Sequence, residues 1–335
     1  MIVRHLKKLH GIDPRSWEHP ADRGALGALR RLKGLDQLVA ALVSATTERS
    51  LRLMQLASSV KVTERQFPRV NAAVEEVTDT FDWPARPAVF VTQSPFFNAG
   101  VLGVKDPFIV LNSSLLRNFG DDELKAMVAH EMGHIMSGHS LYKTLIWLLA
   151  NVSSQLLPMG NVILLPIMAA LSEWNRKSEL SADRAEVLAL QDPRPSLNVL
   201  MRMAGGEDLS QVNLNDFFLQ AREYDEQQSL LDSVHKILNQ LWMSHPYPVE
   251  RIKELQSWSS SGAFQAILDG NYLRRGISPE TPDEDWKAGF EFYRKSVDEA
   301  EDPISRTLSG IGKGLEQAAG ELGERLKDLF GDGSS

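Results

Sequence analysis

The sequence predicts an α+β fold that is mostly helical and carries a small mixed or antiparallel sheet. Over most of the 335 residues, apolar side chains recur every three or four positions, the period of a helix with one buried face. Three short runs rich in β-branched and aromatic residues lie between positions 88 and 112, bounded by Pro, Asn and Asp. These runs can form only a few strands, so helices must build the rest of the fold.

The composition is that of a globular protein without a nucleic-acid-binding surface. Hydrophobic residues make up 43% and charged residues 24%, both ordinary values. The net charge of −8 gives no basic field that would attract nucleic acid, although residues 1–35 are basic. The chain has no Cys and no apolar stretch of signal-peptide length near Met1. We therefore expect a cytoplasmic protein, with peripheral contact at the inner membrane face as the open alternative.

The first 80 residues are predicted to be largely helical. Residues 1–50 form a basic helical segment, in which positions 2–12 have the pattern of a short basic amphipathic helix. Docking of this helix on its own domain is favoured over contact with a membrane surface. Leucines at helical spacing continue over 24–43. Residues 51–62 have the pattern of an extended segment, and residues 64–80 that of a further helix.

Three strands should follow. Residues 88–92 form one strand, and residues 98–103 pair with residues 108–112 across a turn at Asp106 and Pro107.

The segment 144–172 contains no charged residue. It is longer than the roughly 20 residues of a membrane span, but prolines and polar residues such as Asn151 and Pro158 interrupt it. A single crossing would also separate residues that we assign below to one site. We predict two short apolar helices packed as a hairpin, buried in the protein or dipping into a membrane face.

Helical patterns return in the last third of the chain, at 196–204, 214–243 and 249–268. Residues 275–302 are predicted to be an acidic linker. Apolar positions every three or four residues predict an amphipathic C-terminal helix over 303–335, which docks on the protein or on a partner.

The segment His130-Glu131-Met132-Gly133-His134 has the pattern HExxH within a predicted helix. Positions i and i+4 lie about 40° apart around a helix and about 6 Å apart along it, so both imidazoles can bind one zinc ion. Glu131 lies about 100° round the helix, where it can take a proton from zinc-bound water. A structural zinc is disfavoured, because such sites often use Cys. His139 lies about 140° round from His134, and we expect an ordinary polar position.

A catalytic zinc with two His ligands usually takes a third protein ligand. A His six residues after His134 is excluded, because that position is Ser140. A Glu from a later helix is the other route, and Glu179 is the candidate. Asp183 lies one turn further on, where it can accept the outer N–H of a ligating His. On spacing alone, a solvated charged helix face explains Glu179 and Asp183 equally well.

Together these motifs resemble the gluzincin metallopeptidases of the HtpX and CAAX prenyl protease type. The resemblance extends to Asn98-Ala-Gly with its strand, to Ser244-His245-Pro246, and to Glu250-Arg251-Ile252. It implies a mostly helical, zincin-like metallopeptidase domain over 51–274. HtpX-type members have clear membrane-spanning helices, which this chain lacks, so it is more similar to the soluble or peripheral members.

The resemblance implies a zinc endopeptidase that binds one zinc ion through His130, His134 and Glu179. Glu131 would act as general base, and His245 or Arg251 would donate a hydrogen bond to the oxyanion, with His245 favoured. Alternatively, His245 fills the open zinc position in a resting state. A third possibility is that His245 is only a histidine at a helix start and Arg251 only a surface arginine.

The implied substrate is a polypeptide, with misfolded or membrane-associated proteins as candidates. The strand that begins at Asn98 would lie at a sheet edge, where an extended substrate adds through main-chain hydrogen bonds. A closed-site, zinc-containing binding or chaperone-like module is the alternative function, and a zinc hydrolase acting on a non-peptide bond is a third. The substitution Glu131→Gln separates the first two.

Overall fold

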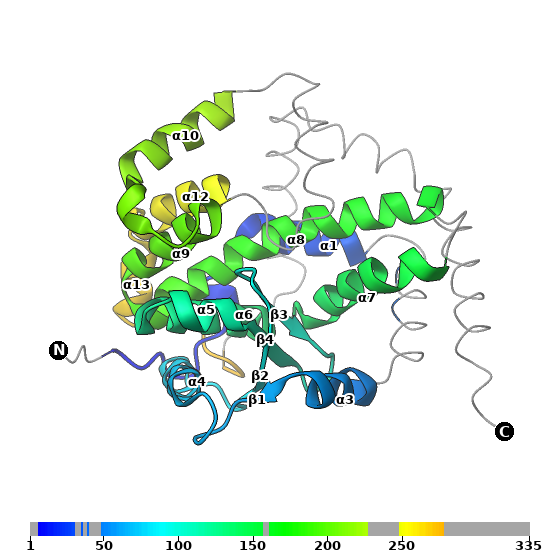
Figure 1. The fold of residues 1–335 in the computed structure, drawn as a ribbon. Coiled ribbons are helices and arrows are strands. Elements are labelled where there is room, and N and C mark those ends of the chain that lie inside the picture. The colour runs from blue at the N-terminus through cyan, green and yellow to red at the C-terminus, as the bar shows by residue number, and fades with distance from the viewer. Residues whose placement is uncertain are drawn as a thin grey trace.

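The computed structural model describes residues 6–30, 35, 39, 48–156, 161–226 and 248–277. It confirms a mostly helical α+β fold with a small mixed sheet (Figure 1). The helices, in chain order, are η1 (Pro14–Ser16), α1 (Pro20–Arg30), α3 (Glu48–Ser58), α4 (Pro68–Thr80), α5 (Ser113–Asn118), α6 (Asp121–Met136), α7 (Ser140–Leu156), α8 (Asn161–Leu190), α9 (Pro193–Gly205), η2 (Leu209–Gln211), α10 (Leu214–Glu226), α12 (Pro248–Ser260) and α13 (Ala263–Leu268).

The sheet has the strand order β1-β2-β4-β3. The strands are β1 (Val60–Lys61), β2 (Ala88–Thr92), β3 (Ala99–Leu102) and β4 (Phe108–Asn112). β2 and β4 are parallel, and the other two pairs are antiparallel. Within the described residues β3 therefore lies at an edge, as predicted for the strand that follows Asn98, and it contacts both α6 and α7.

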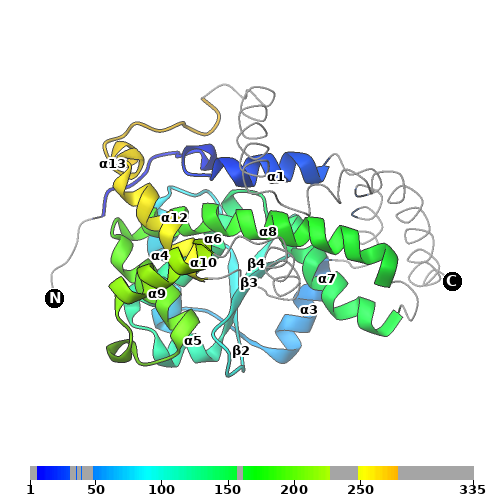
Figure 2. The same ribbon diagram turned by 90° about the horizontal axis from the view of Figure 1, so that it is seen from above.

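Helices α6 and α8 pack closely against each other across the middle of the molecule (Figures 1 and 2). Gly133 makes this approach possible. A Cβ atom at that position would lie 2.8 Å from Ala185 Cβ and 3.2 Å from Ala182 Cα, closer than carbon atoms normally approach. The small residues on both helices thus bring the HExxH segment next to the part of α8 that carries Glu179.

The N-terminal residues differ from the prediction. Residues 6–12 do not form the amphipathic helix, because the chain turns at Gly11, which has a φ of +58°. Leu9 and Ile12 are buried in the main core instead. The Leu9 N–H donates to Thr80 O at 2.7 Å, and the Asp13 N–H donates to Leu273 O at 2.8 Å. The N-terminal segment is thereby tied to two distant parts of the domain, and the predicted boundary near residue 50 stays a prediction.

The prediction of an extended segment over 51–62 was wrong. Residues Glu48–Ser58 form α3, and only Val60–Lys61 are extended. Leu51 and Gln55, at i and i+4, are the buried positions of α3. Leu53, Met54 and Leu56 are exposed, so the apolar residues on the solvent side of α3 obscured its helical period.

The segment 144–172 forms parts of two helices, as predicted. They are α7 and α8, which contact each other. The second is not short, because it continues as one helix from Asn161 through Glu179 to Leu190. Among the helices that the structure describes, none combines the length and the apolar character needed to cross a membrane.

Most of the other predicted elements are present where the structure describes them. The helix predicted over 249–268 is divided into α12 and α13 at Ser261 and Gly262, the second of which has a φ of +82°. Helix α4 and strands β2, β3 and β4 confirm the predictions made for residues 64–112. The predicted helix at 214–243 is described only as far as Glu226. His245, the C-terminal helix and the acidic linker beyond Ile277 lie outside the described residues.

Candidate metal centre

Helix α6 carries the HExxH residues, and its start is stabilised by acidic side chains. Asp121, Asp122 and Glu123 occupy the first turn, where negative charge complements the helix dipole. Glu123 Oε2 also accepts the Gly120 N–H at 3.0 Å. Further along the helix, His130, Glu131 and His134 are all buried. The motif therefore faces the interior of the protein rather than solvent.

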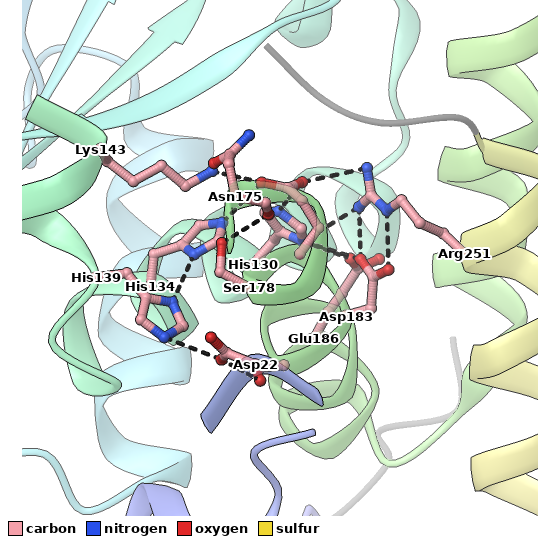
Figure 3. A network of polar contacts seen from close by, with 12 residues as sticks. Asp22, His130, His134, His139, Lys143, Asn175, Ser178, Asp183, Glu186 and Arg251 are labelled. Atoms are coloured by element: carbon pink, nitrogen blue, oxygen red, sulfur yellow. Dashed lines mark hydrogen bonds and ion pairs between the residues drawn. The ribbon is translucent and has the colours of Figure 1, made fainter. Parts of the chain in front are cut away.

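His130, His134 and Glu179 each offer a ligand atom, and these atoms lie within 4.8 Å of one another. Figure 3 shows the two histidines at this centre. His130 Nε2 lies 3.2 Å from Glu179 Oε2, and His134 Nε2 lies 3.2 Å from Glu179 Oε1. The exposed fractions of the three side chains are 1%, 0% and 0%. Donor atoms placed about 2.0–2.2 Å from zinc at tetrahedral corners are about 3.3 Å apart. The spacing found here is that of a zinc ligand set.

An unsatisfied buried atom also fits a metal ion at this point. The 3.2 Å contact between His134 Nε2 and Glu179 Oε1 does not have hydrogen-bond geometry, so within the described residues this nitrogen makes no hydrogen bond although it is inaccessible to solvent. Such atoms are rare because each costs free energy. The donor set of two imidazoles and one carboxylate is one that zinc accepts, so the residues present fit the ion.

Glu131 lies beside the ligand set. Its side chain is 1% exposed, and Glu131 Oε1 has no hydrogen-bond partner among the described residues. A carboxylate oxygen without a donor is free to accept a proton from a substrate or a water molecule. The position therefore suits the general base that the sequence predicted.

A second layer of charged groups surrounds His130. Asp183 Oδ1 lies 3.1 Å and Glu186 Oε2 lies 3.5 Å from His130 Nδ1. Asp183 is thus where the sequence placed it, against the ring nitrogen that does not face Glu179. Glu186, one turn further on, was not foreseen. Burial lowers the pKa of His130, but the hydrogen bonds of Asp183, Glu179 and Glu186 outweigh it and hold that pKa well above its ordinary value.

Arg251 reaches this layer from α12 and is 3% exposed. Its Nε and Nη2 donate to the two oxygens of Asp183 at 2.9 and 2.5 Å, and its Nη1 lies 3.3 Å from Glu179 Oε2. Burial raises the pKa of Asp183, but the charge and hydrogen bonds of Arg251 hold it below its ordinary value. The guanidinium therefore holds Asp183 through two hydrogen bonds, whereas Nη1, which lies near Glu179, makes no hydrogen bond within the described residues. The role of oxyanion donor for Arg251 stays a prediction.

Lys143 is a site residue that the sequence analysis missed. It lies on α7, three residues beyond its start, and its ammonium forms an ion pair with Glu179 Oε1. Burial and the charge of Lys143 hold the pKa of His134 well below its ordinary value. No motif in the sequence pointed to Lys143, because its proximity depends on how α7 packs.

The assignment of His139 as an ordinary polar position was wrong. His139 is 1% exposed, and His139 Nδ1 lies 3.0 Å from His134 Nδ1. The helical argument does not apply, since α6 ends at Met136 and the chain reverses at Gly138, whose φ is +69°. His139 thereby returns beneath His134 instead of continuing round the helix.

Asn98 lies at the start of the edge strand. Its carbonyl oxygen accepts the N–H of Asn112 at 3.0 Å, which extends the β3–β4 pairing by one step. A role for Asn98 in contacting substrate stays a prediction.

Comparisons with known proteins identify the family. Residues 64–259 match Peptidase family M48. The chain is 33% identical over 262 residues to the "Plastoglobule-localized metallopeptidase 48, chloroplastic" of Arabidopsis thaliana. This match covers 77% of this chain and 76% of the Arabidopsis protein. It is 25% identical over 225 residues to a "Protease HtpX homolog" of Trichormus variabilis, covering 58% of this chain and 75% of the relative.

A "Protease HtpX homolog" of Helicobacter pylori is 22% identical over 227 residues, covering 60% of this chain and 70% of the relative. No solved structure matches the chain at a significant level. The matched residues include the HExxH helix, Glu179 and Arg251. The chain therefore belongs to Peptidase family M48 and is a metallopeptidase of the HtpX-like type.

Proposed function

We propose that this metallopeptidase is a zinc-dependent endopeptidase with one zinc ion per chain. The observation that carries the proposal is the convergence of three buried side chains, in which His130 Nε2 and His134 Nε2 each lie 3.2 Å from an oxygen of the Glu179 carboxylate. A His₂Glu set leaves a fourth tetrahedral position open for chemistry, as catalytic rather than structural zinc sites do.

The residues of the chain divide the work of hydrolysis. Zinc, when bound, supplies a Lewis acid that polarises a carbonyl oxygen and lowers the pKa of a coordinated water toward 7. Glu131 accepts the proton of the attacking water and returns it to the leaving amine, for which its unpaired buried oxygen is suited. Asp183 accepts the outer N–H of His130, and Arg251 holds Asp183 in place. Assignment of the oxyanion donor to His245 rests on the family resemblance.

The substrate is proposed to bind as an extended polypeptide along β3. This strand is paired on one side only within the described residues, and it contacts α6, the helix that carries Glu131. Main-chain hydrogen bonds to an edge strand tolerate many sequences. They suit a peptidase that acts within unfolded, misfolded or membrane-associated proteins.

For location we propose a cytoplasmic enzyme, with peripheral contact at the inner membrane face through residues 144–172 rather than the N-terminus, because Leu9 and Ile12 of the N-terminal segment are buried in the core. The name of the Arabidopsis relative places that protein at plastoglobules. Flotation of the full chain with anionic and neutral liposomes tests this proposal, and failure to float with either would contradict it.

The proposed activity is tested by cleavage of unfolded casein with zinc-loaded wild type and Glu131→Gln. We expect internal cleavage by the wild type alone, with zinc retained by the variant because Glu131 is not a ligand. Equal cleavage by both would show that Glu131 is not the base. Retention of zinc without cleavage by either would favour the closed-site binding module instead.

A further inference from the structure

A buried chain of polar contacts runs from the metal centre to the N-terminal segment (Figure 3). His134 Nδ1 lies 3.0 Å from His139 Nδ1, and His139 Nε2 lies 3.1 Å from Asp22 Oδ2. Ser181 Oγ donates to the same Asp22 oxygen at 2.6 Å. The three side chains that form the chain are no more than 2% exposed. Solvent therefore cannot substitute for any of its members.

The segment that carries Asp22 is fixed to the helix that carries Glu179. Helix α1 packs along α8, and the backbone N–H of His19 donates to Ser181 Oγ at 2.9 Å. Ser181 lies two residues beyond Glu179 on α8. Asp22 thus reaches the metal centre from outside residues 64–259, the part of the chain that matches the family.

If His134 binds a metal through Nε2, only one assignment of donors and acceptors along these contacts is possible. Its Nε2 must then be unprotonated, so a neutral His134 holds its proton on Nδ1 and donates it to His139 Nδ1. His139 accepts there and must hold its own proton on Nε2, which donates to Asp22. An acceptor-only group at the end of the chain selects this arrangement, and an ionised carboxylate is such a group.

We propose that His139 and Asp22 are positioning residues for zinc, which orient His134 and fix the proton on its Nδ1 through an imidazole-to-imidazole hydrogen bond. The inference deepens the proposed zinc site and rests on His134 being a ligand. It makes residues 18–22 of the N-terminal segment part of the metal centre.

The charge on Asp22 is consistent with this arrangement. Two hydrogen bonds reach the same carboxylate oxygen, one from His139 Nε2 and one from the Ser181 hydroxyl, and hydrogen bonds of this kind favour the ionised form. An ionised Asp22 has no proton to donate and can only accept. The ring of His139 is also held by Trp174, whose ring centroid lies 5.5 Å away at an edge-to-face angle of 83°.

The test is a measurement of zinc affinity by competition with a chromogenic chelator. Asp22→Leu keeps the branched shape of the side chain and removes the acceptor, and His139→Leu removes the middle of the chain. Each should lower the affinity about 10- to 100-fold, the usual effect of losing a group that orients a ligand. The double variant should bind no more weakly than the weaker single variant, because both changes break one pathway.

Two further variants separate positioning from general destabilisation. Asp192→Leu removes another buried carboxylate, the N-cap of α9, and should destabilise the fold with zinc affinity unchanged. His139→Gln offers an amide oxygen to His134 and an N–H to Asp22, so it should recover affinity relative to His139→Leu. If Asp22→Leu does not fold, the comparison of zinc affinity between His139→Gln and His139→Leu still tests the proposal.

His134→Ala distinguishes the two levels of the argument. One outcome would keep the zinc site and refute the positioning role. In it, wild type binds zinc, His134→Ala does not, and both Asp22→Leu and His139→Leu bind zinc as tightly as wild type. Additive losses in the double variant would equally refute a pathway through His139. If His134→Ala binds zinc as tightly as wild type, the proposed site itself fails.

Discussion

Substitution of Gly133 by Ala should weaken zinc binding and should destabilise the metal-free fold only modestly. The new Cβ would lie 2.8 Å from Ala185 Cβ and 3.2 Å from Ala182 Cα. Carbon atoms pack at about 3.5–4.0 Å, so α6 and α8 must separate by about 1 Å at this point. His130 and His134 are on one helix and Glu179 is on the other.

Both expected effects follow from this close contact between α6 and α8. Overpacking of this kind costs about 1–3 kcal/mol, and Ala returns about 1 kcal/mol of helix propensity relative to Gly. The free energy of unfolding without zinc should therefore fall by only about 0–2 kcal/mol. Zinc–ligand distances tolerate deviations of about 0.2 Å, so a 1 Å separation should lower zinc affinity at least about tenfold.

The assay combines thermal unfolding of the metal-free protein with chelator competition for zinc. Gly120→Ala is the matched control, because it makes the same change at the N-cap of α6, where a Cβ would have no neighbour within 4 Å. The control should bind zinc normally. If Gly133→Ala bound zinc as tightly as wild type and unfolded at a higher temperature, the close approach of α6 to α8 would not be what positions the ligands.

Three further predictions follow from buried or shared charges. Burial and the charge of Asp22 raise the pKa of Glu18 from 4.5 to about 7. Glu18 is therefore protonated more readily in the folded state than in the unfolded state, so the free energy of unfolding should fall by at most about 3 kcal/mol as pH rises from 4.5 to 7. Glu18→Gln, measured at equal zinc, should make the free energy of unfolding less dependent on pH, and an unchanged slope would contradict the raised pKa of Glu18. Arg251→Met removes the buried guanidinium that pairs with Asp183 and leaves that carboxylate buried with the contact to His130, so chemical denaturation should show a loss of about 3–5 kcal/mol. A loss below about 1 kcal/mol would refute the role of Arg251 in holding Asp183. Glu48 accepts three backbone N–H groups of the β3–β4 turn at 2.7–3.2 Å, so Glu48→Ala should cost about 1–3 kcal/mol and speed amide exchange there, whereas unchanged exchange would show that the turn holds without it.

The parts of the centre that follow from local geometry could be predicted from the sequence. His130 and His134 share a helix face through their i, i+4 spacing, and Asp183 follows Glu179 by the same interval. The strands at 88–112 were equally accessible, because alternation and turn residues are local signals. Helix α3 was missed for a local reason too, since its solvent face carries Leu53 and Leu56.

The remaining site residues arrive through packing over long stretches of chain. Asp22 lies 117 positions from His139 in sequence, and Lys143 lies 36 positions from Glu179. No periodicity within one sequence encodes such contacts, because they depend on how α1 and α7 lie against α8. Sequence reasoning therefore found the candidate ligands and Asp183, and the family resemblance named Arg251. The contacts of Lys143, Glu186 and Asp22 were missed.

His139 shows where a correct helical argument stops being valid. The rotation of about 140° from His134 holds only while the helix continues, and the chain carried a signal that it does not. Gly138 can adopt a positive φ at little cost, so a Gly placed just after a helical run marks its end. Beyond such a residue the angular position of a side chain is no longer fixed by spacing, and a His there can return to the same site. The spacing of His139 therefore excluded this residue as a further ligand on the helix face of His130 and His134. The same spacing did not exclude the contact between His139 Nδ1 and His134 Nδ1 that the structure contains.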